Sequence, residues 1–119
     1  INEDLATYCD DRGKTMLPYT PLLRGAYVRR DRPIAAAYQG PDTDARLGAL
    51  QEVSEELGAT PNQVVLAWMM QRQPPMIPIF SAGIPAHMRE NLGALDIQLS
   101  PAQMTKLNMA GHCPNEEPN

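Results

Sequence analysis

Apolar side chains recur at helical spacing in five stretches of the chain, each bounded by start and stop signals. The first stretch predicts a helix that Asn2 caps and Gly13 ends, with acidic residues in its first turn. The second predicts a helix from Asp44, as its N-cap, to Gly58. Each of these helices has one apolar face, so each should pack on a core while its other face meets water.

Three further helices begin at prolines. Thr60 and Ser100 each precede a proline and stand three residues before a glutamine, which is the capping-box arrangement of a helix start. A Gln-Pro-Pro sequence stops the first of these helices, and Gly111 ends the last. Between them Pro85 opens a helix whose apolar positions stay in phase as far as Leu95.

Two short apolar runs, at residues 15–20 and 76–80, have the length of buried strands. Helices lie between them, which predicts a helical crossover and parallel pairing. Pro18 donates no ladder hydrogen bond and therefore indicates a strand end or an irregular position. Residues 22–43, rich in Arg, Gly and Pro, predict a long loop. Two parallel strands need neighbours, so this α/β unit looks incomplete.

The predicted core combines the helical stripes with both strands. Its members are Leu5, Leu17, Val53, Val65, Trp68, Ile77, Ile79, Met88, Leu92 and Leu107.

Composition narrows the classes of function. The chain has 119 residues, 43% of them hydrophobic, and a net charge of -4, which fits one globular domain and argues against nucleic acid as a partner. Its longest apolar run is far below the ~20 residues of a membrane span. Cys9 and Cys113 have no partner at metal-ligand spacing, which indicates no metal site and favours a reducing, cytoplasmic setting. Because the chain starts at Ile1, we expect it to be processed or cut.

Four motifs occur in order along the chain: Tyr-Thr-Pro-Leu at 19–22, Gln-Val-Val-Leu-Ala-Trp at 63–68, Ile-Pro at 77–78 and Glu-Asn-Leu at 90–92. Together they resemble the C-terminal part of an aldo-keto reductase, from Asn2 to about Ala110. The resemblance implies a C-terminal fragment of a (β/α)8 TIM barrel, with about two parallel strands and flanking helices. Residues 1–111 would form this part, and residues 112–119 a flexible polar tail. A complete barrel needs about 250 residues.

Enzymes of this family reduce aldehydes and ketones to alcohols with a nicotinamide cofactor, usually NADPH. Their catalytic Asp, Tyr, Lys and His lie on earlier strands that have no counterpart here. The resemblance therefore implies no catalytic residue in this chain, and we expect the 119 residues alone to be inactive. The resemblance implies instead that this chain supplies the cofactor-binding part of the enzyme. It also implies that the complete protein acts on a small carbonyl substrate.

The resemblance places two groups of cofactor-binding residues at the ends of the two strands. Tyr19 matches the aromatic residue that stacks on the nicotinamide ring, although a core tyrosine is the simpler reading. The loop after it matches the segment that covers the pyrophosphate, and a solvated surface loop is the alternative; its residues are Thr20, Pro21, Leu22, Arg24 and Gly25.

The second group follows the second strand. Ser81, Ala82 and Gly83 match a turn that leads into a helix N-terminus, which suits the adenosine 2'-phosphate. His87, Glu90 and Asn91 stand at helical spacing and would contact the adenosine part, with an ordinary solvated face as the alternative.

The chain departs from the family pattern in two places. Many relatives have Arg or Lys where this chain has Gly83, Ile84 or His87, so NADH stays a second candidate cofactor. Pro18 replaces a small or aliphatic residue beside Tyr19. A different class of function is also open: a stand-alone, non-catalytic helical interaction module, or a fragment that self-associates through exposed apolar surface.

Overall fold

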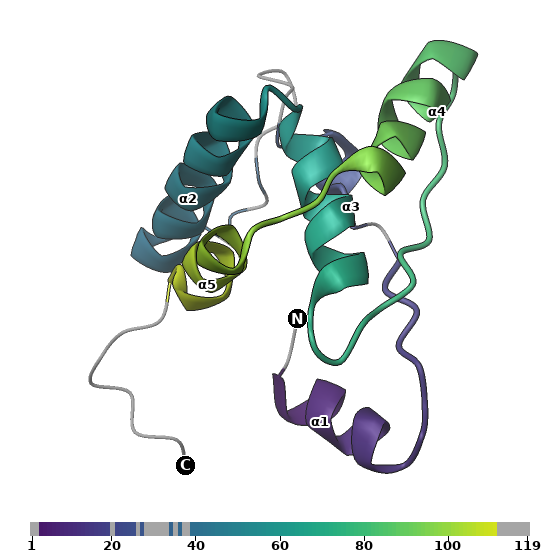
Figure 1. Cartoon of the computed structure of the whole chain (residues 1–119), viewed down its shortest axis with the longest axis vertical. Helices are drawn as coiled ribbons and strands as arrows, with labels where there is room; N and C mark the ends of the chain where they lie inside the picture. The colour runs from purple at the N-terminus through teal and green to yellow at the C-terminus, as the bar shows by residue number, and fades with distance from the viewer. Residues whose placement is uncertain are drawn as a thin grey trace.

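The computed structural model describes residues 3–19, 21–25, 27, 34, 36 and 39–111. Its helices are α1 (Glu3–Asp11), α2 (Pro41–Leu57), α3 (Pro61–Gln71), α4 (Pro85–Leu92) and α5 (Pro101–Met109), with the 3-10 turns η1 (Leu23–Gly25) and η3 (Gly93–Asp96) (Figure 1). The predicted tail at 112–119 and much of the predicted loop at 22–43 lie outside the described residues. None of the helices in the described part is long and apolar enough to cross a membrane.

Local signals determined most helix ends as expected. The Thr60 hydroxyl accepts the Gln63 backbone N–H at 3.3 Å, and the Gln63 side chain accepts the Thr60 N–H at 3.1 Å. Ser100 and Gln103 repeat this arrangement at the start of α5, at 3.1 and 2.9 Å. Both predicted capping boxes are therefore confirmed. Gly58 ends α2 with a φ of 63°, a left-handed conformation that favours glycine.

Two predicted ends were wrong. Helix α2 begins at Pro41, so Asp44 is not its cap but lies in its first turn, where its N–H bonds the Gly40 carbonyl at 3.0 Å. Proline is favoured at a first helical position and acidic residues suit the whole first turn, which explains the earlier start. Helix α4 ends at Leu92, because the chain tightens into η3 before Leu95.

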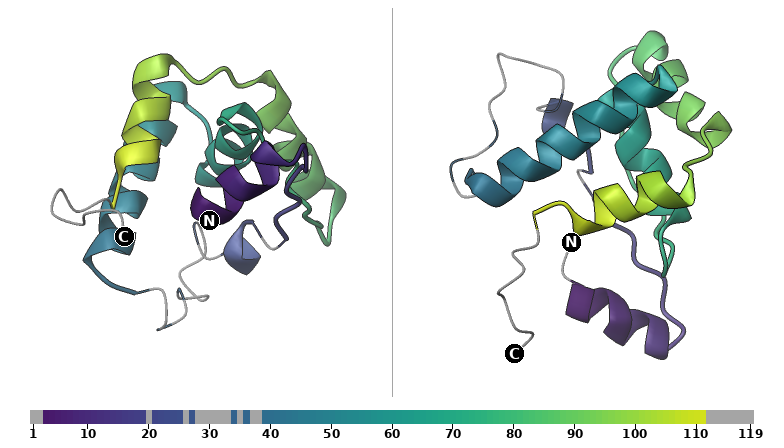
Figure 2. Two further views of the ribbon diagram at one scale, coloured as in Figure 1. Left: turned by 90° about the horizontal axis from the view of Figure 1, so that it is seen from below. Right: turned by 60° about the vertical axis from the view of Figure 1, so that its left-hand side comes forward.

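Helix α3 lies at the centre of the fold, between α2 and α4, as both views of Figure 2 also show. Its buried side chains meet residues of α2, of η3 and of the segment before α5. This main core consists of Leu50, Val53, Val64, Leu66, Ala67, Ala94 and Leu99. A smaller cluster of Ala6, Met69 and Met76 packs α1 against the other end of α3. Residues of α3 belong to both clusters, so this helix joins the two ends of the molecule.

Half of the predicted core was wrong. Val53 is buried as expected, and Val65, Trp68, Met88 and Leu107 are half-buried. The exposed ones are Leu5, Leu17, Ile77, Ile79 and Leu92. Leu5 and Leu92 lie on helices packed from one side only, so an apolar position beyond that contact faces solvent. The other three belong to the segments predicted as strands.

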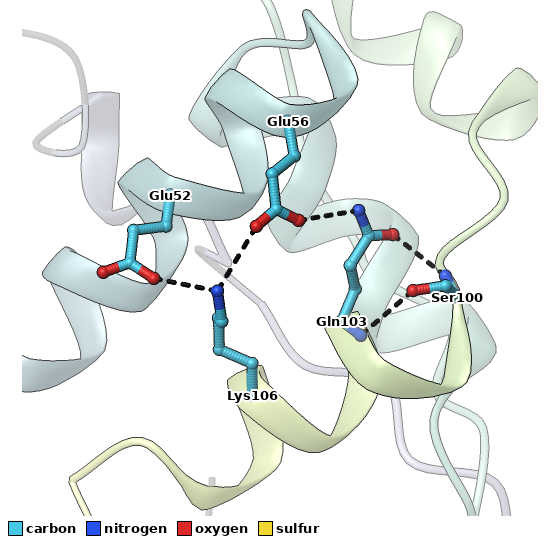
Figure 3. Close-up of polar contacts among 5 residues, drawn as sticks. All are labelled: Glu52, Glu56, Ser100, Gln103 and Lys106. Carbon is cyan, nitrogen blue, oxygen red and sulfur yellow. Dashed lines mark hydrogen bonds and ion pairs between the residues drawn. The ribbon is translucent and has the colours of Figure 1, made fainter.

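A polar network ties α5 to α2 on the surface (Figure 3). The Lys106 ammonium contacts Glu52 at 2.8 Å and Glu56 at 3.3 Å, and the Gln103 amide donates to Glu56 at 3.1 Å. The hydrogen bond from Gln103, followed by Lys106, lowers the pKa of Glu56 below its ordinary 4.5. The hydrogen bonds to Glu52 and Glu56 raise the pKa of Lys106 above its ordinary 10.5.

This network predicts a pH-dependent contribution to stability. The pKa of Glu56 is lower in the folded chain than in the unfolded chain. The contribution of Glu56 to stability is therefore complete at pH values above its pKa in the unfolded chain, and it is lost as the pH falls through its pKa in the folded chain. We therefore expect Lys106→Met to lower the melting temperature slightly at neutral pH and to have less effect in acid. Thermal unfolding from acid to neutral pH measures the difference in melting temperature between Lys106→Met and the unsubstituted chain. Lys14→Met is the control, because it removes an exposed lysine outside the network. A difference in melting temperature that is constant with pH would show that Glu56 and Lys106 do not stabilise the fold through their charges.

Candidate functional site

The two segments predicted as strands lie side by side and run in the same direction, at the right of Figure 1. The Ile77 N–H donates to the Met16 carbonyl at 3.1 Å, and the Ile79 N–H donates to the Pro18 carbonyl at 2.9 Å. Tyr19 and Ile79 form a parallel bridge. In the described part of the chain the pairing is limited to this isolated bridge, so the expected pair of full strands was wrong in extent. The predicted parallel direction is confirmed.

Successive side chains of the paired segments point to opposite faces. One face carries Met76, which is buried with Met69 and Ala6 against α1 and α3. The other, which we call the open face, carries Leu17, Tyr19, Ile77 and Ile79, all exposed. An apolar run suggested burial on both sides, as in a closed parallel sheet. The described elements cover one side only, and this explains why the three aliphatic residues were wrongly predicted to be in the core.

Tyr19 lies at the end of the open face, and its side chain is 82% exposed. The reading as a core tyrosine is therefore wrong. After it, Pro21 is buried and Leu22 packs on the main core, while Gly25 closes η1 with a φ of 90° and an N–H bond to the Leu22 carbonyl at 2.8 Å. Thr20 lies outside the described residues, and Arg24 is described only as part of η1. The backbone after Tyr19 is thus anchored to the core.

Tyr27 follows this turn and also packs on the main core. Burial raises the pKa of its phenol above the ordinary 10.0, so the group stays neutral at physiological pH.

The second group of predicted residues begins two residues after the bridge. Ser81 and Gly83 are exposed and Ala82 is half-buried, and together they lead directly into α4. The N-cap of α4 is Ile84, which offers no side-chain acceptor, and Pro85 occupies the first turn. The first free N–H groups of α4 therefore have no side-chain cap, unlike those of α3 and α5. Because Tyr19 pairs with Ile79, both groups lie at the same end of the paired segments.

The three residues predicted to share one face of α4 differ in their exposure. His87 and Glu90 are exposed, whereas Asn91 is only 6% exposed. The Asn91 Oδ1 is enclosed and has no hydrogen-bond partner among the described residues. Helical spacing identified the right helix, but it gave no sign that Asn91 lies at the buried edge of that face.

A feature that the sequence did not reveal holds this helix in place. The Gln63 Nε2 donates to the Glu90 carbonyl at 2.7 Å, across 27 positions of sequence. The capping-box signal identified Gln63 as an acceptor at the start of α3 but said nothing of its donor group. Among the described residues no group of three or more His, Cys, Asp or Glu side chains is arranged to hold a metal ion.

The sequence model of the Aldo/keto reductase family matches residues 1–111. The chain belongs to the aldo/keto reductase family. It is 46% identical to an NADP(+) aryl-alcohol dehydrogenase of Phanerodontia chrysosporium, over 91% of this chain and 32% of that protein. It is 33% identical to an uncharacterized oxidoreductase of Schizosaccharomyces pombe, over 92% of this chain and 31% of that protein.

A solved structure agrees with this assignment. A thermostable aldo-keto reductase in complex with the inhibitor epalrestat superposes with a TM-score of 0.67 at 30% identity, over 89% of this chain and 33% of that one. This aldo/keto reductase chain therefore spans about a third of the length of these relatives. The family is one of oxidoreductases, and the backbone of this chain is similar to part of a solved member of it.

Proposed function

We propose that this chain carries the cofactor-binding part of a nicotinamide-dependent carbonyl reductase. Residues 1–111 form the C-terminal part of a (β/α)8 barrel, with the two segments that pair at Tyr19 and Ile79 as two of its strands. The observation that carries the proposal is the Tyr19–Ile79 bridge, which brings both groups of predicted binding residues to one end of a parallel pair. In barrels of this class the site lies at that carboxyl end of the strands.

The residues present fit a dinucleotide. The exposed ring of Tyr19 offers a flat apolar surface on which a nicotinamide ring stacks, and this fixes which side of the nicotinamide faces the substrate. The uncapped N–H groups of α4 suit a phosphate; His87 is exposed in the same first turn, and Glu90 is exposed one turn further on. NADPH, when bound, supplies the hydride that reduces a carbonyl carbon.

The remaining assignments follow the family. Thr20, Pro21, Leu22, Arg24 and Gly25 cover the pyrophosphate, and Asn91 belongs with His87 and Glu90 to the group that contacts the adenosine part. Without Arg or Lys at Gly83, Ile84 or His87, NADH is the second cofactor of the proposal. The substrate is a small carbonyl compound, and the setting is the cytoplasm.

The proposal assigns no catalytic residue to this chain. The family's catalytic Asp, Tyr, Lys and His have no counterpart in its motifs, so we expect the 119 residues to bind cofactor without turning over an aldehyde. Binding and turnover are therefore measured separately, and binding tests the proposal.

Replacing Tyr19 tests the stacking role directly. We expect Tyr19→Ala to weaken NADPH binding about tenfold, because the loss of one aromatic stacking partner costs up to about 1.5 kcal/mol, and Tyr19→Phe to keep nearly all of the affinity. Titration of the cofactor's own fluorescence measures it. Tyr8→Ala is the matched control, since Tyr8 is an exposed tyrosine on α1, whose ring faces Arg12.

Self-association through the open face is the competing outcome of the same experiment. Leu17, Ile77 and Ile79 are exposed apolar side chains next to Tyr19, and such surface favours association between copies. Sedimentation at the same protein concentrations separates the two functions. A silent NADPH titration together with a mass that rises with concentration would overturn the cofactor proposal for this chain.

A further inference from the structure

One side chain joins the first turn of α3 to the last turn of α4. The Gln63 Oε1 accepts the Thr60 N–H at 3.1 Å, while its Nε2 donates to the Glu90 carbonyl at 2.7 Å. The amide is thus held at both ends. We propose that Gln63 is a positioning residue that sets α4 for the adenosine half of the cofactor, an inference that rests on the proposed function.

Gly93 supplies the space for this bond. A Cβ at Gly93 would lie 2.6 Å from the Gln63 Nε2, closer than such atoms approach. The φ of Gly93 is -59°, which any residue adopts, so backbone conformation does not require a glycine there. The requirement is instead the room that the Gln63 side chain occupies between the two helices.

The bond matters because α4 has only 8 residues. A helix of this length has no stability of its own, so contacts with the rest of the fold determine where it lies. Its packing partners are α3 and η3, and the Gln63 bond is made at the carbonyl directly before Asn91. Fixing that carbonyl fixes the backbone that carries Glu90 and Asn91, and a preorganised site binds more tightly than one that must be ordered.

The chain contains its own matched control. Gln103 occupies the same capping-box position in α5, and its Nε2 donates to Glu56 at 3.1 Å, away from α4. Substitution by Glu keeps the capping acceptor in both helices, because Glu and Gln serve equally at this position, and it replaces the Nε2 donor with a carboxylate oxygen. Gln63→Glu and Gln103→Glu also add the same charge.

The test measures the two halves of the cofactor separately, by calorimetric titration of the 119-residue chain with adenosine 2',5'-bisphosphate and with reduced nicotinamide mononucleotide. We expect Gln63→Glu to weaken the bisphosphate about fivefold and to leave the mononucleotide unchanged. Gln103→Glu should change neither. Gly93→Ala, which displaces the Gln63 amide without adding charge, should reproduce the selective loss.

Three results overturn the inference in distinguishable ways. Equal bisphosphate affinity in Gln63→Glu and the unsubstituted chain shows that Gln63 does not position the site, while the proposed function stands. Equal losses in Gln63→Glu and Gln103→Glu, or losses of both probes, show a purely structural role. If the unsubstituted chain binds neither probe, the proposed function fails and the inference fails with it. Thermal unfolding of each variant confirms that it is folded at the titration temperature.

Discussion

Leu66→Ala is expected to lower the free energy of unfolding by about 3 kcal/mol, because it truncates a side chain at the centre of the main core. Leu66 is 1% exposed and lies in the middle of α3. Truncation to alanine removes buried methyl and methylene groups and leaves a cavity that α2 and η3 close only in part. Because a domain of this size has roughly 5–15 kcal/mol of stability, the loss is a large share of the total.

Urea unfolding followed by the fluorescence of Trp68, the single tryptophan, measures this loss. Leu95→Ala is the matched control, since Leu95 is 68% exposed and undergoes the same chemical change on the surface. We expect its effect to stay within about 0.5 kcal/mol. Similar losses in the two variants would mean that α3 is not the centre of the core.

Local sequence signals predicted the helices because their physical causes are local. A capping box joins residues three apart, as at Thr60 and Ser100, so the sequence contains the whole interaction. The start of α2 was misplaced for a related reason: Pro41 and Asp44 both suit a first turn, and the pattern alone did not rank them. The family resemblance was likewise readable, because its motifs are short and ordered along the chain.

Burial was predicted correctly where a described neighbour covers the side of the element on which the residue lies. Val53 faces α3 and is buried, as helical periodicity indicated. Ile77 and Ile79 have the same apolar character, yet they face away from the helices. An apolar run gives the tendency of a strand to be buried but not which elements are present to cover it, so the open face was not foreseen.

The candidate site shows the same division. The family resemblance implied its position, because both recognised strand ends lie on the same face of a barrel, and this is why Tyr19 and Ser81 were expected together. The hydrogen bond from Gln63 to Glu90 and the enclosure of Asn91 depend on packing between helices. No sequence pattern encodes contacts of that kind.

A second long-range contact holds α1 on the fold, and its loss is expected to be nearly as costly as that of Leu66. The Arg72 guanidinium donates to both carboxylate oxygens of Glu3, at 3.1 and 2.7 Å, and its side chain is only 4% exposed. It also lies 5.1 Å from the centre of the Trp68 ring. Arg72 is thus a buried cation whose neutralising partner comes from the first turn of α1, 69 positions away in the sequence.

Glu3→Gln is expected to lower the free energy of unfolding by about 2 kcal/mol. Removing one partner of a fully buried ion pair costs about 3–5 kcal/mol, and the half-exposed Glu3 places this pair below that range. Asp4→Asn is the matched control, because it removes the neighbouring charge from the same helix turn and should cost at most about 1 kcal/mol. Urea unfolding of both variants gives the comparison, and equal losses would show that only the helix dipole is involved.

The double variant Glu3→Gln with Arg72→Met decides where the energy of this pair resides. If the cost of Glu3→Gln comes from leaving the Arg72 charge buried without a partner, removing that charge should restore part of the stability, because an apolar side chain of similar length fills the same space. If the ion pair instead stabilises α1 by its own attraction, the double variant stays as unstable as Glu3→Gln. We expect the double variant to be more stable than Glu3→Gln. The Arg72 Nε is buried without a hydrogen-bond partner among the described residues, so Arg72 already carries a desolvation cost that its replacement by Met removes.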